Sequence, residues 1–225
     1  MKTASRNLYA LLRRTLLLGA LMTTIAAPSA AADTTTSTNS TPKWALEFKG
    51  GIFEPDLPDY ETFYGSDDNG LWAVAGAYRF YNWLELGLEL SYAKDNGTGT
   101  LADENSLGGD VEYTLVPLQL FVNLRYDVAP DQLFVPYAGV GLAMAWYRQK
   151  ISRQGDRDGT SDIGGAARAG LQLSLNRLMP STVTYSRGDQ LLKSYLFLEA
   201  QYFSTEKDSI DLGGNAYLLG LRLEF

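Results

Sequence analysis

Hydrophobic and polar residues alternate with a period of two along much of the chain. Residues 84–92 place Leu or Tyr at every even position and Glu, Gly or Ser at every odd one, and residues 118–126 and 217–225 follow closely related patterns. Because successive side chains of a β-strand point to opposite faces, each segment predicts a long strand with one apolar face. Weaker alternation predicts five more strands, at Lys43–Glu54, Gly70–Tyr81, Phe134–Gln149, Ile163–Arg177 and Leu192–Ser204.

The lengths of these strands and of their connections favour a membrane barrel. A tilted strand crosses a bilayer in about 9 to 11 residues, whereas strands of soluble proteins have about 5 to 6. Long polar loops on one rim and short turns on the other are typical of outer-membrane barrels. We expect long loops at 54–69, 94–110, 150–162 and 205–213, and short turns at 81–83 and 127–133. The connection 178–190 falls where a short turn is expected, so it predicts either an insertion or misplaced strand borders.

The positions that alternate with the apolar ones form a second row on the other face of each strand. The residues of this second row distinguish a membrane barrel from a soluble barrel or sandwich. In a soluble barrel this row would be solvated, but here it holds many small residues, which suit the narrow lumen of eight strands. They include Ala73, Ala75 and Ala77 in one strand and Gly139, Gly141, Ala143 and Ala145 in another. The predicted fold is therefore all-β, an eight-stranded antiparallel up-and-down transmembrane β-barrel.

Charged residues on the same row balance to zero, five acidic against five basic. They are Glu47, Lys49, Arg79, Glu85, Glu89, Arg125, Arg168, Glu199, Arg222 and Glu224. Buried charges persist when they are paired, so the balance predicts a lumen ion-pair network. If this row faced lipid, placing the five basic side chains in the bilayer would cost about 2 to 4 kcal/mol each, or roughly 10 to 20 kcal/mol in total. The apolar row must therefore face the lipid.

Aromatic residues lie near the ends of the apolar rows, where a barrel meets the two membrane interfaces. The alternative is ordinary aromatic packing in a soluble core. The expected girdle residues are Trp44, Trp72, Phe80, Tyr92, Tyr126, Trp146, Tyr202, Tyr217 and Phe225.

Pro117 has no backbone N–H to donate to the strand ladder, so it predicts a bulge or the start of the intramembrane part of its strand.

The N-terminal region has the pattern of a secretory signal peptide over residues 1–32. A basic start precedes an apolar stretch of 13 residues, which is too short for a membrane-anchoring helix of about 20 residues. Small residues then place cleavage after Ala32 or Ala31. Residues 33–42 are polar and predict a flexible periplasmic tail, which leaves residues 43–225 as the barrel domain.

Charge and missing residue types exclude several functions. Without the leader, 15 basic residues stand against 26 acidic ones, which excludes nucleic acid as a partner. The chain has no His and no Cys, which removes histidine-dependent catalysis, imidazole metal sites and disulfides. Glu85 and Glu89 lie roughly 13 Å apart along one strand, wider than a glycosidase pair at about 6.5 to 9.5 Å. We expect no catalytic residue, no cofactor and no metal.

The strand fragments VPLQLFVNLRY and VPYAGVGLAMAWY and the ending AYLLGLRLEF resemble the small outer-membrane β-barrel family of the OmpA transmembrane domain, OmpX and OmpW. The resemblance implies both termini in the periplasm and location in the cell outer membrane. It also implies that Tyr217, Leu221, Leu223 and Phe225 form the signal read by the β-barrel assembly machinery. Since the chain ends at the barrel, the peptidoglycan-binding domain of OmpA is not expected.

The expected function is a structural or surface-interaction role without catalysis, among outer-membrane lipids and lipopolysaccharide. An extracellular ligand is expected to bind through acidic loop residues, although their spacing matches no EF-hand; the residues are Glu54, Asp56, Asp59, Glu61, Asp67 and Asp68. The alternative is an OmpW-like conduit for small apolar compounds, which needs an apolar outer lumen and a side opening. Phe53, Tyr113, Leu115 and Tyr147 are predicted to face inward there. An enzyme is a third hypothesis, but the known enzymes on such barrels depend on histidine.

Overall fold

The computed structural model describes residues 42–56, 68–98, 110–129, 132–151, 155–178, 193–207 and 210–225. The predicted signal peptide and all of the predicted tail except Pro42 lie outside these residues. No helix within the described ranges is long and apolar enough to span a membrane.

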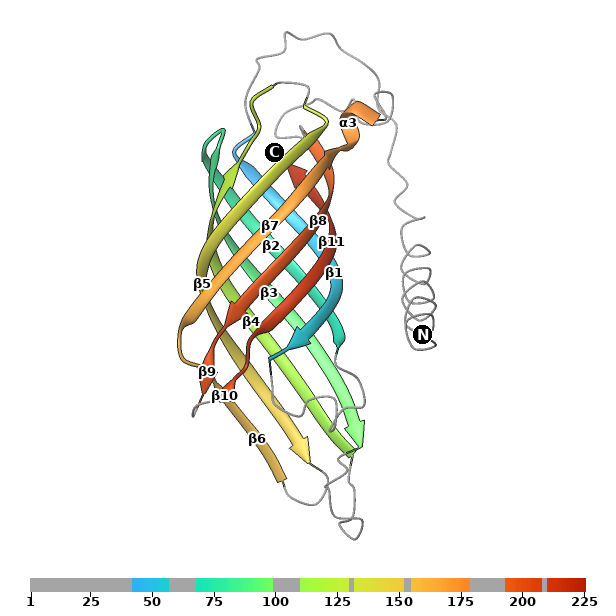
Figure 1. The fold of residues 1–225 in the computed structure, drawn as a ribbon, viewed down its shortest axis with the longest axis vertical. Coiled ribbons are helices and arrows are strands. Elements are labelled where there is room, and N and C mark those ends of the chain that lie inside the picture. Colours follow the sequence, from blue (N-terminus) through green and yellow to red (C-terminus); the bar gives the residue numbers. More distant parts are fainter. Residues whose placement is uncertain are drawn as a thin grey trace, which may run out of the picture. The chain divides into compact units, whose positions relative to one another are not determined.

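Eight strand positions close into an antiparallel barrel (Figure 1), as the alternation predicts. The wall runs in the order β4-β3-β2-β1-β11-β8-β7-β5, and β4 also pairs with β5, which closes the ring. The strands are β1 Trp44–Pro55, β2 Asn69–Tyr81, β3 Leu84–Thr98, β4 Asp110–Arg125, β5 Phe134–Ile151, β6 Gly155–Thr160, β7 Gly164–Ser174, β8 Lys193–Ser204 and β11 Gly214–Glu224. We call the rim with residues 42 and 225 the terminal end and the opposite rim the loop end.

The eighth position is shared by β6 and β7, which both pair with β5. Trp146 pairs with Thr160 of β6, and Ala143 pairs with Gly164 of β7. The three residues 161–163 therefore lie opposite the two residues 144–145 of β5, which makes a bulge. Ser161 spans this bulge: its N–H donates to the Ala145 carbonyl at 2.8 Å, and its Oγ accepts from the Ala145 N–H at 2.8 Å. The prediction of a loop at 150–162 is therefore wrong for residues 155–160, whose strand is polar on both faces.

Other strand borders also differ from the prediction. β3 continues to Thr98 and β4 begins at Asp110, so part of the expected loop 94–110 is strand. Two short strands, β9 Glu206–Lys207 and β10 Ile210–Asp211, occupy part of the expected loop 205–213. The strand predicted at Ile163–Arg177 ends at Ser174, because Leu175–Leu178 forms a helical turn, α3. The connection after it lies outside the described residues.

Pro117 produces no bulge, so the first of its two predicted roles is wrong, while the start of the intramembrane part stays a prediction. Leu118 pairs with Leu90 and Leu115 pairs with Ala93, which is the same register on both sides of the proline. The pairing with β5 is likewise unbroken through Pro117 and Ala145. Only the ladder to β3 is interrupted beside the proline, consistent with its missing N–H donor.

The two faces of the wall differ as the alternation predicts. Outward side chains such as Leu88, Val140 and Leu198 are more than half exposed, whereas the inward rows are buried. All nine predicted girdle residues are exposed, together with Tyr81 and Trp83 at the terminal end. Between the aromatic rows the described outward side chains carry no charge. This surface fits a lipid environment.

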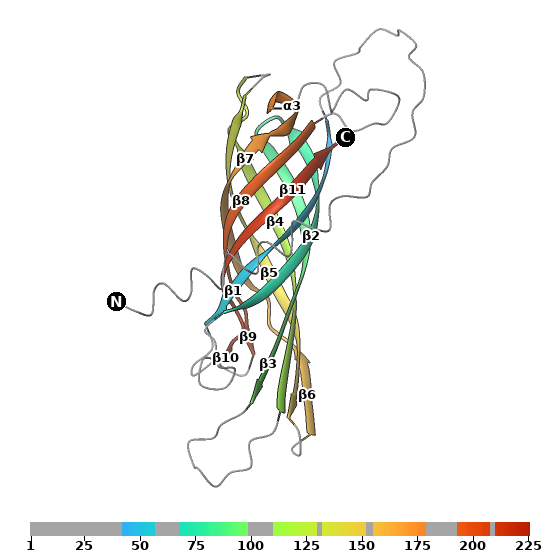
Figure 2. The ribbon, with the colours of Figure 1, turned by 90° about the vertical axis from the view of Figure 1, so that its right-hand side faces the viewer.

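The wall is taller on one side. β3, β4, β5 and β6 extend past the loop-end limits of β1, β2, β8 and β11 (Figure 2). Pairing continues along this extension, from Lys94 with Thr114 to Arg148 with Asp158. Four strands therefore project beyond the closed ring.

Candidate functional site

The candidate site is the lumen, where the structure brings together all ten charged residues that sequence analysis placed on the inward rows. They come from β1, β2, β3, β4, β7, β8 and β11, and the most exposed of them, Arg79, is only 7% exposed. Within the lumen they form two clusters, described in turn below.

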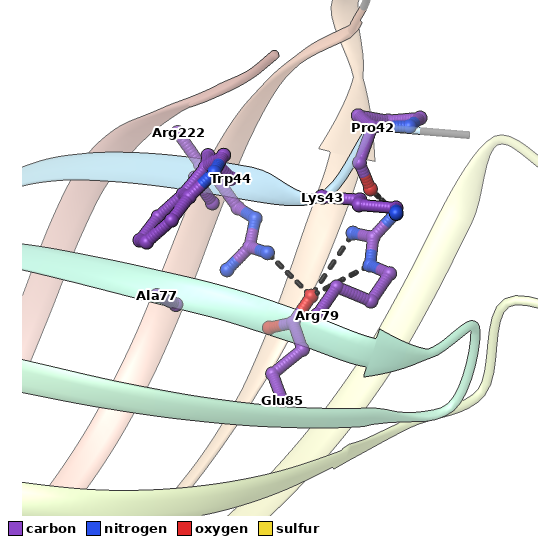
Figure 3. A pocket seen from close by; sticks show the side chains of 8 residues that line it. Pro42, Lys43, Trp44, Ala77, Arg79, Glu85 and Arg222 are labelled. Carbon is purple, nitrogen blue, oxygen red and sulfur yellow. Dashed lines mark hydrogen bonds and ion pairs between the residues drawn. The ribbon is translucent and has the colours of Figure 1, made fainter. Parts of the chain in front are cut away.

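The end cluster lies nearest the terminal end and consists of Arg79, Glu85, Arg125, Arg222 and Glu224. The Oε1 atom of Glu85 accepts hydrogen bonds from Arg79 Nη2 at 2.9 Å, Arg125 Nη1 at 2.7 Å and Arg222 Nη2 at 2.6 Å. Glu224 Oε1 accepts from the same three arginines at 2.6 to 2.8 Å. Figure 3 shows Arg79 and Arg222 converging on the Glu85 carboxylate.

The middle cluster consists of Glu47, Lys49, Glu89, Arg168 and Glu199. Lys49 Nζ contacts both Glu199 and Glu89, the latter at 2.6 Å. Arg168 Nη1 lies 3.2 Å from Glu89, 3.6 Å from Glu199 and 3.9 Å from Glu47. Neutral side chains complete the bonding, since Tyr137 donates to Glu199 at 2.6 Å and Gln201 donates to Glu89 at 3.1 Å.

Arg222 joins the two clusters. Its Nη1 donates to Glu47 of the middle cluster at 2.6 Å, while Nη2 and Nε donate to Glu85 and Glu224 of the end cluster. With Arg222 shared in this way, each cluster has partners for its charges. Buried carboxylates and guanidinium groups require such pairing.

Aromatic rings against glycines fill the space between the charges. Phe121 pairs across the strands with Gly87, Phe197 with Gly220, and Tyr137 with Gly170. A methyl group on Gly87 would lie 2.2 Å from Phe121, so the ring occupies the place of a side chain. Arg168 packs over the same ring, with its Cζ 3.2 Å from the ring centroid. Such a contact favours a cation.

Sequence analysis predicted small residues on the inward rows, but it did not single out these ring and glycine pairs. Phe121 stands between the polar residues Gln119 and Asn123 on the inward row of β4, and Phe197 precedes Glu199 on that of β8. An aromatic residue opposite a glycine on such a row is a signal that could have found them, once the register is known.

An apolar layer occupies the lumen between the charged clusters and the loop end. Phe53, Leu71, Leu115, Phe203 and Leu218 are each at most 2% exposed and pack in one cluster. The rings of Phe53 and Phe203 stack with their centroids 5.4 Å apart. Tyr113 belongs to the cluster and Tyr147 packs against it. The four predicted inward residues of this region therefore do face inward.

A small pocket without room for a water molecule lies at the terminal end, between Pro42, Ala77, Arg79, Glu85 and Arg222 (Figure 3). Arg79 and Arg222 both donate to the Oε1 atom of Glu85 there, while Glu85 Oε2 is buried without a hydrogen-bond partner among the described residues. Among the described residues, no group of three or more acidic side chains could hold a metal ion. Most of the acidic loop, including Asp59, Glu61 and Asp67, lies outside the described residues.

The residues of the predicted assembly signal lie on the outward face of β11 and just after it. Tyr217 is half exposed, Phe225 is 40% exposed, and Leu221 and Leu223 are partly exposed. The Phe225 main-chain oxygen accepts hydrogen bonds from the N–H groups of Lys43 at 2.8 Å and Trp44 at 3.2 Å. Phe225 thus extends the seam between the first and last strands.

Solved structures with the same fold are small outer-membrane barrels. Neisserial surface protein A is 15% identical, with a TM-score of 0.54, covering 81% of this chain and 97% of that protein. OprG from Pseudomonas aeruginosa is 13% identical, with a TM-score of 0.53, covering 82% of this chain and 97% of that one. At these identities the likeness concerns the fold. Among curated proteins, none matches the sequence significantly.

A family model gives the assignment. The model of the outer membrane protein beta-barrel domain matches residues 17–225, which is nearly the whole chain. This match agrees with the closed ring, the uncharged outward surface and the aromatic rows described above. The chain therefore belongs to the outer membrane protein β-barrel domain family, and its location is the cell outer membrane.

Proposed function

We propose that the protein is a sealed outer-membrane barrel with a structural or surface-interaction role and no catalytic activity. The observation that carries this proposal is the filling of the lumen at two successive levels, by the ten paired charges and by the apolar layer. The barrel then serves as a rigid membrane anchor that holds the loop end outside the cell.

Each level opposes a different solute. An ion passing the apolar layer would lose its hydration among Phe53, Leu115 and Phe203, whose side chains have no polar group to replace it. A small apolar compound that passed this layer would meet the charged clusters, whose groups bond to one another. Passage of either solute therefore requires rearrangement of one level or both.

The proposed partners follow from this role. Outer-membrane lipids cover the uncharged outward face, and lipopolysaccharide would surround the loop end. The β-barrel assembly machinery would read Tyr217, Leu221, Leu223 and Phe225 during insertion. The acidic first loop supports binding of an extracellular ligand, and nucleic acid is no partner for a chain this acidic.

Solute uptake into liposomes tests the proposal. Reconstituted parent protein should admit neither a small sugar nor a small apolar dye faster than protein-free liposomes do. The control is the F53A/F203A double variant combined with R222A, which removes parts of both levels. If it folds, this variant should admit the sugar. Uptake of the sugar by the parent would contradict the sealed lumen.

The second candidate is a conduit for small apolar compounds, and the apolar layer is the observation that favours it. Its side chains could line a path for an apolar solute if they moved apart and a side opening formed. The same liposomes separate the candidates, because a conduit would admit the apolar dye but exclude the sugar. In that case F53A/F203A should change dye uptake while R222A should not.

A further inference from the structure

The taller side of the wall carries a polar patch on its outward face, directly beyond an aromatic row. Tyr92 on β3 and Trp146 on β5 belong to this row and are both exposed. Two residues further along the same strands, about 6 to 7 Å, stand Lys94 and Arg148. They are the first charged outward side chains on these strands after the uncharged surface.

The patch has the layout of a phosphate cradle. Lys94 pairs with Thr114 and Thr114 pairs with Arg148, so two cations flank a hydroxyl across three neighbouring strands. Two strand spacings separate the cations by about 10 Å at their backbones, which flexible Lys and Arg side chains can close over one anion. Lys150 follows Arg148 on the same face in the next row.

Glu112 is the acidic residue of β4 within this patch, and Asp156 of β6 pairs with Lys150 in the ladder. Glu112 also pairs with Lys150 in the ladder, and its carboxylate lies 3.0 Å from Lys94 Nζ and 4.0 Å from Lys150 Nζ. The hydrogen bond from Lys94 lowers the pKa of Glu112, and the charges of Lys94, Lys150 and Arg148 lower it further. On the other flank, Asp158 of β6 pairs with Arg148 in the ladder.

Position determines what can reach these groups. The outward face below the aromatic row is lipid-covered in the outer membrane, and side chains about one row beyond that level meet lipid headgroups. Lys94, Glu112 and Lys150 are each between a third and a half exposed, so a headgroup can contact them.

We propose that Lys94, Thr114 and Arg148, assisted by Lys150, bind a phosphate group carried by a lipid headgroup of the outer leaflet. Lys and Arg supply the charge-assisted hydrogen bonds that phosphate requires, and the Thr114 hydroxyl supplies a third donor between them. Glu112 competes with the phosphate for Lys94. This inference rests on the outward orientation of the loop end, but not on whether the lumen conducts.

The test measures binding of lipopolysaccharide to the purified, folded barrel in detergent at fixed ionic strength. K94Q and R148Q should each weaken binding about fivefold, since one cation near a lipid surface contributes about that factor. R157Q is the matched control, because Arg157 pairs with Gln149 on the row of β5 that faces the barrel axis. It should leave binding unchanged. E112Q should strengthen binding, an effect that a purely structural role would not produce.

Two further measurements distinguish a phosphate carried by a lipid from free inorganic phosphate. Dephosphorylated lipopolysaccharide should bind as weakly as the K94Q/R148Q double variant binds the intact lipid. Inorganic phosphate at millimolar concentration should not displace the intact lipid. Equal binding of the dephosphorylated lipid, full displacement by inorganic phosphate, weakening by E112Q, or an equal loss in R157Q would each overturn the proposal. Heat-modifiable migration on gels confirms that every variant is folded.

Discussion

Arg222 and Glu47 face each other across the seam where the first and last strands of the barrel meet, and Arg222 Nη1 lies 2.6 Å from Glu47 Oε1. The same guanidinium bonds Glu85 and Glu224, so one side chain at the seam connects both charged clusters. Both groups of the pair are 1% exposed.

Arg222→Met should strongly destabilise the barrel, because it leaves three buried carboxylates short of a donor. Removing one partner of a buried pair typically costs about 3 to 5 kcal/mol. Urea unfolding in detergent should show this loss. The control is Arg157→Ala, where an exposed side chain contributes about 0 to 1 kcal/mol. Equal midpoints for the two variants would mean that the network does not stabilise the fold.

Arg125→Ala should also shift unfolding to clearly lower urea, and Arg79→Ala should shift it less. Arg125 is 3% exposed and adds a bond to Gln172 at 2.7 Å, whereas Arg79 borders the pocket at the terminal end. Both arginines share Glu85 and Glu224 with Arg222. If both variants unfold like the parent, the account of the end cluster is wrong.

Gly87→Ala tests the fit of rings against glycines. The added methyl would lie 2.2 Å from Phe121, which must move and disturb its contact with Arg168. Overpacking of this kind costs about 1 to 3 kcal/mol. Gly76→Ala is the matched control on the neighbouring strand, because a methyl there meets no atom within 4 Å. If Gly87→Ala and Gly76→Ala unfold at the same urea concentration, the close packing of Phe121 against Gly87 is contradicted.

The wall and the inventory of lumen charges could be predicted from sequence because they depend on period-two alternation alone. Glu85 and Glu89 stand out as acids on the row opposite the leucines of β3. Which acid meets which base depends on the stagger of strands far apart in the chain, as for Lys49 and Glu199, and no local pattern encodes it.

β6 was not predicted as a strand, for a different reason. Beyond the membrane neither face of a strand must be apolar, so residues 155–160 carry no alternation and look like a loop. The role of Phe121 was missed although the residue lies on the predicted inward row of β4. Its role depends on Gly87, which only the register brings opposite.

Deleting Phe225 should lower the amount of inserted barrel while export across the inner membrane continues. The deletion removes a partly exposed ring and the main-chain oxygen that bonds Lys43 and Trp44. Phe225→Ala keeps the main chain and isolates the ring. Quantitative blotting of outer-membrane fractions measures the effect. Parent levels of both variants would remove this residue from the assembly signal.

The Glu112 carboxyl should titrate below its ordinary pKa of 4.5, because Lys94 donates a hydrogen bond to its ionised form. Its small stabilising effect should be present above the ordinary pKa and be lost as the pH falls through the lowered one. Carbon-13 NMR of the labelled carboxyl follows this titration. Lys94→Gln should raise the midpoint, and an unchanged midpoint would exclude the contact.

Ion conductance across a planar bilayer tests the sealed lumen most directly. Ten paired charges and the apolar layer leave no path for hydrated ions, so the inserted parent should give no steady channel. Heat-modifiable migration verifies that the protein in the same preparation is folded. The variant carrying F53A, F203A and R222A should conduct if it folds. Steady, long-lived conductance by the parent would contradict the account and favour a water-filled channel.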